Sequence, residues 1–562
     1  MILTLALFIL PVALAASLGT GTLTKRANST GRNEPWGRIT PTDNLVWHPA
    51  TPSPRVPLDY SDPKGRKAAI ALIRKPPTNK ENYRGPVFFN PGGPGGSGVD
   101  LIQSIGDALS IILGNGFDIV LFDPRGIARS TPRASHFDTD IERALFAAEA
   151  GSFPVVSNST VSGIQRTWAQ AQLLASLAAS HDDGYLQHIN TANTATGIVE
   201  AYGEEKLQYW GFSYGSMLGS TFAAMYLDKV QGLVIDGVGD SNDYYSAAWL
   251  NNMVDSEKAL QLFFDHCAEG GPVKCPFYSP NPADIKRNLT ALYERLQVEP
   301  VVVNANTLYG VIDYTLVRSL VFSSLYTPYD SFKPLADALA QLAAGNGTAV
   351  LSLRPPKVPK CSSDPHERDW ERVDEGFATK KLLEVTEFAD VWGQLHASCA
   401  NWPKGKRLFR GPFIGNTSYP MPVIVNTAGA CFAPRSLSVS LAHISALDPV
   451  TPLRYAEKIA KGFKDSVVLN IDAGGHCSLN APSICALQYV RQYFQNGTLP
   501  EPDTVCEPTS KNPFLPPPAD KGKVARRAIK CVGGEKAELR SALTQLSKLQ
   551  SRFSPFSKQN RL

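Results

Sequence analysis

The feature that most constrains this 562-residue chain is a serine enclosed by glycines, where an apolar segment gives way to a helical one. Residues 206–212 have the short apolar pattern of a buried strand, and residues 216–227 have the pattern of a helix. The junction between them reads Gly211-Phe212-Ser213-Tyr214-Gly215. A turn this sharp needs small residues on both sides of the serine, and it places the serine hydroxyl above the edge of a sheet.

Apolar segments of the same kind recur along the chain and predict a mostly parallel sheet. They are residues 86–90, 117–123, 232–236, 422–427 and 466–471. A helix is predicted over residues 453–461. Because strands alternate with helices, the fold class is predicted to be α/β, with helices flanking the sheet. Residues 241–398 are mostly helical in pattern and are predicted to form a cap inserted into the α/β core.

A serine hydroxyl is a weak nucleophile unless a base removes its proton. His476 is the candidate base, since it follows two glycines just after the predicted strand 466–471. Asp448, which begins Asp-Pro-Val-Thr-Pro, is the candidate acid that would orient the imidazole, and helix capping is its alternative role. Asp236, at the end of strand 232–236, is the alternative acid. The order Ser213, Asp448, His476 is the order that this type of sheet uses.

The glycine-rich segment 90–98, Asn-Pro-Gly-Gly-Pro-Gly-Gly-Ser-Gly, follows the first strand of the predicted sheet. Glycines let the main chain approach a substrate carbonyl closely. We predict that the N–H groups of Gly93 and Tyr214 form an oxyanion hole. A phosphate-binding loop is disfavoured, because the segment lacks a Gly-Lys-Ser/Thr ending and its prolines remove N–H donors.

Features of an exported protein occur along the chain. Residues 1–16 have the apolar core and small-residue ending of a signal peptide, and are too short to span a membrane. Lys25-Arg26 predicts removal of a propeptide, residues 17–26. Six Asn-x-Ser/Thr triplets are candidate glycosylation sites: Asn28, Asn158, Asn288, Asn346, Asn416 and Asn496. We therefore predict a secreted, extracellular glycoprotein without a membrane span.

The nine cysteines favour disulfides in an oxidising compartment, with at least one left over. The candidate pairs are Cys267 with Cys275 and Cys485 with Cys506. Metal-ligand spacings and dinucleotide-binding patterns are absent from the sequence, so no metal and no cofactor is predicted. The net charge of +4 comes from the C-terminus, where residues 519–562 hold 11 Lys and Arg against 3 Asp and Glu. A nucleic-acid partner is therefore not expected.

Taken together, the motifs resemble one family along residues 50–510. The matching stretches are residues 56–60, 90–98, 122–126, 209–216, 235–238, 399–403, 448–452 and 475–476. They resemble the secreted tripeptidyl-aminopeptidase-like α/β-hydrolases, in the prolyl aminopeptidase family of serine peptidases. The resemblance implies an α/β-hydrolase core in two halves, 27–240 and 399–510, the second TAP-like. It also implies triad roles for Ser213, Asp448 and His476.

The chain departs from this family in three places. Ala128 replaces a glycine in the segment after Asp-Pro-Arg-Gly. Residues 428–447 separate the strand 422–427 from Asp448, and residues 431–440 within them have no counterpart in the family, so we hypothesise a translated intron or an insertion. Residues 511–562 lie beyond the resemblance and are predicted to be a basic, mostly disordered tail, in which residues 537–553 have the pattern of a short amphipathic helix.

The motifs predict a serine hydrolase that acts through an acyl-enzyme. The family resemblance implies an aminopeptidase-type exopeptidase that releases short peptides or amino acids. Two alternatives remain open. One is a secreted carboxylesterase or lipase with the same triad, since fold alone does not select between peptide and ester substrates. The other is an inactive hydrolase fold used for binding. The oligomeric state is left open.

Overall fold

The computed structural model describes 14 parts of the chain, all within one compact unit, Trp36–Leu562. They are residues 46–48, 55–135, 137–151, 163–202, 206–246, 252–305, 308–353, 388, 390–391, 409, 411–415, 423–427, 448–516 and 533–550. The predicted signal peptide and propeptide, the inserted segment 428–447, Asn28, Asn158 and Asn416 lie outside them.

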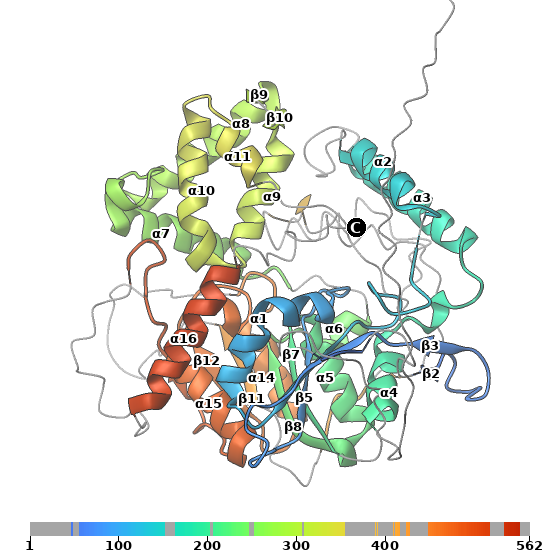
Figure 1. The fold of residues 1–562 in the computed structure, drawn as a ribbon. Helices are drawn as coiled ribbons and strands as arrows, with labels where there is room; N and C mark the ends of the chain where they lie inside the picture. Colours follow the sequence, from blue (N-terminus) through green and yellow to red (C-terminus); the bar gives the residue numbers. More distant parts are fainter. Residues whose placement is uncertain are drawn as a thin grey trace, which may run out of the picture. The chain divides into compact units, whose positions relative to one another are not determined.

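A nine-stranded sheet runs through the described residues in the order β1-β4-β6-β5-β7-β8-β11-β12-β13 (Figure 1). In chain order these strands are Val46–His48, Leu72–Lys75, Pro86–Asn90, Asp118–Phe122, Leu207–Phe212, Val230–Asp236, Val423–Thr427, Val467–Ile471 and Val505–Cys506 (β1, β4, β5, β6, β7, β8, β11, β12, β13). From β6 to β13 neighbouring strands are parallel, whereas β1 and β4 pair antiparallel at one edge. The predicted mostly parallel sheet is confirmed.

The strands read as continuous apolar runs because helices cover both faces of the sheet. Phe89 and Trp210 face one hydrophobic cluster, formed with α1, α15 and α16, while Phe88 and Tyr209 face another, formed with α4, α5 and α14. These helices are Gly98–Leu113, Ile484–Asn496, Gly533–Gln550, Thr191–Tyr202, Tyr214–Met225 and Leu453–Gly462. Outside these layers lie a hairpin, β2 (Arg55–Pro57) with β3 (Lys67–Ala69), and the helices α2 (Asp140–Gly151), α3 (Gly163–Ser180) and α6 (Ser241–Tyr245).

A third hydrophobic cluster lies in the region between β8 and β11, where the sequence predicts a cap. Its helices are α7 (Ser256–Lys274), α8 (Pro282–Val298), α9 (Tyr314–Ser324), α10 (Pro328–Ala343) and α11 (Thr348–Ser352). The antiparallel hairpin β9 (Val301–Ala305) and β10 (Leu308–Ile312) joins α8 to α9. This part of the chain therefore has a packed interior, to which Val450 and Phe514 from beyond β11 also belong.

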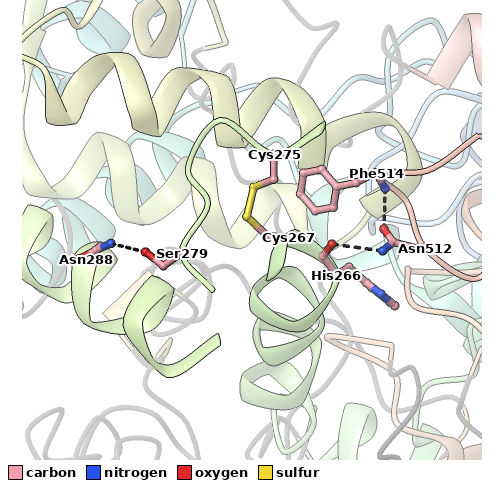
Figure 2. The surroundings of a disulfide bond; sticks show 7 residues. All are labelled: His266, Cys267, Cys275, Ser279, Asn288, Asn512 and Phe514. Atoms are coloured by element: carbon pink, nitrogen blue, oxygen red, sulfur yellow. Dashed lines mark hydrogen bonds between the residues drawn. A yellow bond between two sulfur atoms is a disulfide. The ribbon is translucent and has the colours of Figure 1, made fainter. Parts of the chain in front are cut away.

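Both candidate cysteine pairs are joined in the structure, Cys267 to Cys275 and Cys485 to Cys506. The first closes the C-terminal end of α7, and the chain that follows β13 packs beside it (Figure 2). Asn512 Nδ2 donates to the main-chain oxygen of His266 over 3.1 Å, and Phe514 packs on Phe263 with ring centroids 5.9 Å apart. Cap helix α7 is thus held by a segment from the far end of the core.

Helix α16, Gly533–Gln550, lies within the predicted tail 511–562, at the place where the sequence predicts a short amphipathic helix over residues 537–553. Leu539, Ala542 and Leu546 are buried against the cluster that covers one face of the sheet. Glu535 forms an ion pair of 3.2 Å with the buried Arg491 of α15. These apolar residues are spaced three and four apart, as in an amphipathic helix, and α16 packs beside α1 (Figure 1).

Candidate active site

Ser213 occupies the turn between β7 and α5 with a backbone conformation that side chains rarely adopt, φ 57° and ψ −120°. A Cβ atom at Gly215 would lie 2.9 Å from the main-chain oxygen of Asn90, so no larger residue fits there. The Ser213 N–H donates to the main-chain oxygen of Asp236 over 2.8 Å. The glycine spacing seen in the sequence thus corresponds to a strained, tightly packed turn at the C-terminal edge of the sheet.

Asp448 and His476 are in direct contact. The Nδ1 atom of His476 lies 2.9 and 3.0 Å from the two carboxylate oxygens of Asp448. Both side chains are nearly inaccessible, with 1% of Asp448 and 6% of His476 exposed. The Asp448 carboxylate also accepts the main-chain N–H groups of Val450 and Thr451, at 3.0 and 2.8 Å. A carboxylate held this way fixes the orientation of the imidazole.

Ser213 is connected to this pair through the turn that follows β8. The main-chain oxygen of Asp236 accepts the Ser213 N–H, and the next residue is Gly237. A Cβ atom at Gly237 would lie 3.2 Å from Cε1 of His476. The contacts of the described residues include no hydrogen bond between the Ser213 hydroxyl and His476. Such bonds are often loose without substrate. The structure therefore brings Asp448 and His476 together and places Ser213 beside the same turn.

Asp236, the alternative acid, does not bind the imidazole. Its carboxylate accepts the N–H and the O–H of Ser478 and the indole N–H of Trp210, the last over 3.2 Å. Burial of this fully enclosed side chain raises its pKa to about 6. Of the two acids weighed in the sequence, Asp448 is the one that contacts His476.

The glycine-rich loop lies against Ser213. A Cβ atom at Gly92 would be 2.7 Å from Cβ of Ser213, so this close approach requires glycine. The Gly92 N–H donates to Asn90 Oδ1 over 2.9 Å, whereas no partner for the Gly93 N–H occurs among the described residues. Tyr214 is the first residue of α5, so its N–H lies at a helix N-terminus, where amides favour a negative oxygen.

One contact to His476 comes from the region between β8 and β11, where a cap is proposed, and was not predicted from the sequence. The main-chain oxygen of Tyr326 accepts the N–H of His476 over 2.9 Å, and the two rings pack edge to face. Tyr326 is the second residue after α9 and lies 150 residues before His476. Because the hydrogen bond is between main-chain atoms, no side-chain motif indicated it.

Three candidate glycosylation residues lie in the described part of the chain. Asn288, Asn346 and Asn496 are all exposed. Within the same part, no helix is long and apolar enough to cross a membrane, and no group of three or more His, Cys, Asp or Glu side chains is close enough to hold a metal ion.

Comparison with known proteins agrees with this geometry. Residues 85–272 match the alpha/beta hydrolase fold family, and residues 440–506 match the TAP-like protein family. Serine protease Hip1 of Mycobacterium tuberculosis is 27% identical over 482 residues, which cover 80% of this chain and 86% of that protein. Tripeptidyl aminopeptidase of Streptomyces lividans is 24% identical over 480 residues, covering 81% and 82%.

Carboxylesterase B of M. tuberculosis is similar to the same extent, at 25% identity over 482 residues, covering 81% of this chain and 85% of that protein. Relatives with peptidase names and with an esterase name therefore each match about four fifths of the chain. The matched families and the serine turn agree on the coarse class of the protein. The chain has the α/β-hydrolase fold with a match to the TAP-like protein family in its C-terminal region, and its relatives support a serine hydrolase.

Proposed function

We propose that this protein is a secreted exopeptidase that releases amino acids or short peptides from peptide N-termini, with Ser213, Asp448 and His476 as its catalytic triad. The observation that carries the proposal is the buried contact between Asp448 and His476, beside the strained turn of Ser213. A buried Asp–His pair beside a serine at the C-terminal edge of the sheet supports a role in acyl transfer.

In the proposed reaction, His476 takes the proton of the Ser213 hydroxyl as Ser213 Oγ bonds to the carbonyl carbon of the substrate. The negative oxygen that forms is stabilised by the N–H groups of Gly93 and Tyr214. When the C–N bond breaks, His476 gives its proton to the leaving amine. Water then repeats the sequence on the acyl-enzyme, which releases the acid product and restores Ser213.

Asp448 and His476 are in contact in a chain that contains residues 428–447, which supports the proposal that this segment is compatible with a working triad. The contact supports an active enzyme rather than an inactive hydrolase fold that is used for binding. Secretion is supported by the two disulfides and by the exposure of Asn288, Asn346 and Asn496, which we propose are glycosylated.

An esterase is the second candidate, because Carboxylesterase B matches as much of the chain as the peptidases do. A matched set of substrates distinguishes the two. Purified protein is assayed on a fluorogenic tripeptidyl amide with a free N-terminus, on the N-acetylated form of that amide, and on short-chain p-nitrophenyl esters, with Ser213→Ala as control. We expect Ser213-dependent cleavage of the free amide and none of the acetylated one. Cleavage of esters alone would replace the peptidase with the esterase.

A further inference from the structure

Asp236 contacts the segments that carry both Ser213 and His476, without a hydrogen bond to either side chain. It ends β8, and its carboxylate is completely buried. One carboxylate oxygen accepts the Ser478 N–H over 2.8 Å, and the other accepts the Ser478 hydroxyl. Ser478 is two residues beyond His476, so these bonds hold the loop that carries the histidine.

The other contacts of Asp236 include the segment that carries Ser213. The indole N–H of Trp210, three residues before Ser213, donates to its carboxylate over 3.2 Å. The main-chain oxygen of Asp236 accepts the Ser213 N–H over 2.8 Å and lies 3.5 Å from Sγ of Cys477. A single residue thus joins β7, the serine turn and the histidine loop.

We propose that Asp236 is a positioning residue that sets the placement of His476 relative to Ser213; this inference rests on the proposed function. All three groups that meet its carboxylate are donors: the Ser478 N–H, the Ser478 O–H and the Trp210 indole N–H. A carboxylate accepts from all of them, whereas an asparagine amide would turn an N–H₂ group toward a donor.

The chemistry of this residue argues against packing alone. Burial disfavours the ionised form and raises the pKa of Asp236 to about 6, so an acid here costs stability at neutral pH. A side chain chosen for stability would be apolar or neutral. The carboxylate is instead placed where it restrains the two segments whose spacing decides whether proton transfer occurs.

The test compares Asp236→Asn with Asp118→Asn. Asp118 is a matched control, because it is also buried, with 3% exposed, and its carboxylate accepts from Arg74 Nε and the Tyr83 hydroxyl over 2.8 and 2.7 Å. Asp118 begins β6, at the N-terminal ends of the parallel strands, whereas Asp236 lies at their C-terminal ends. The readouts are kcat, KM and the rate of Ser213 labelling by a fluorophosphonate probe.

We expect Asp236→Asn to lower kcat and the labelling rate by about 10- to 100-fold with KM within about twofold, because a small misplacement of reacting groups has this effect. Asp118→Asn should change neither by more than about twofold. Ser478→Ala, which removes one hydroxyl from the same site, should lower kcat by roughly tenfold and provides the test if Asp236→Asn does not fold.

Wild-type kcat in Asp236→Asn, or in Ser478→Ala if the first variant is unfolded, would overturn the inference while leaving the proposed function intact. Equal losses in Asp236→Asn and Asp118→Asn would also overturn it, since they would indicate a general loss of stability. No Ser213-dependent labelling of the wild-type protein would overturn the proposed function, and this inference with it.

Discussion

The main-chain oxygen of Tyr326 accepts the N–H of His476 over 2.9 Å, and the two rings meet edge to face with centroids 5.2 Å apart. Tyr326 belongs to the cap, in the turn that joins α9 to α10, whereas His476 lies on a loop after β12 of the core. The cap therefore contacts the proposed catalytic base directly, and its position and the orientation of His476 are coupled.

This contact predicts that a cap substitution alters the chemical step. Tyr326→Ala removes the ring that packs on the imidazole and should lower kcat by about tenfold or more, with a smaller effect on KM. Tyr326→Phe keeps the ring and should retain most of the activity. Tyr309→Ala is the control, since Tyr309 lies on β10 of the same cap and is 75% exposed. Equal kcat for Tyr326→Ala and Tyr309→Ala would contradict the coupling.

The contact between Asp448 and His476 makes a second prediction. Asp448→Asn should lower kcat by about 10³- to 10⁴-fold, because an amide no longer holds the imidazole in its reactive tautomer. Asp472→Asn serves as the control; Asp472 is nearer to His476 in sequence but is hydrogen-bonded through its N–H to Cys506. Steady-state kinetics on one fluorogenic substrate measures both. If Asp472→Asn were the more damaged variant, the acid assignment would be wrong.

A third prediction concerns stability and pH. Burial raises the pKa of Asp236 from 3.8 to about 6, so the folded protein binds this proton more tightly than the unfolded chain does. The contribution of Asp236 to the free energy of unfolding therefore falls as the pH rises from about 4 to about 6. One pKa unit corresponds to about 1.4 kcal/mol, so the total change is roughly 3 kcal/mol.

Asp236→Asn lacks this titration, so its stability relative to wild type should increase over the same pH range. Denaturant unfolding of both proteins at several pH values between 4 and 7 measures the difference. A difference that stays constant across this range would show that Asp236 titrates alike in the folded and unfolded states.

Helix α16 supplies a fourth prediction. Leu539 is completely buried against the cluster formed by α1 and α15, so Leu539→Ala should lower the free energy of unfolding by about 2–5 kcal/mol. Ser541→Ala, an exposed position on the same helix, should have little effect. Denaturant unfolding distinguishes them. Equal stability of both variants would show that the packing of Leu539 does not contribute to the free energy of unfolding.

Much of the core could be predicted from sequence, because local signals coincide with the global fold. Residues 86–90 were predicted as a strand and form β5 with the same bounds, since burial on both faces makes such strands uniformly apolar. The strand β4, Leu-Ile-Arg-Lys, was missed because it is short and ends in two charged residues.

The candidate site, too, could be predicted from the sequence only in part. The glycines around Ser213 and the chain order of Ser213, Asp448 and His476 are local or sequential signals, and the Asp448–His476 contact agrees with them. The contacts of Tyr326 and Asp236 depend on main-chain atoms and on Ser478, which carry no recognisable motif. Such contacts between distant segments are set by tertiary packing.

The central claim is that Ser213 is a nucleophile activated by His476. The most direct measurement is labelling of the purified full-length protein with a fluorophosphonate probe, followed by mass spectrometry of the modified peptide. We predict one covalent adduct on Ser213 in the wild type, none in Ser213→Ala, and labelling slowed by at least about 10³-fold in His476→Ala. An unlabelled wild-type protein, or equal labelling of wild type and Ser213→Ala, would contradict the claim.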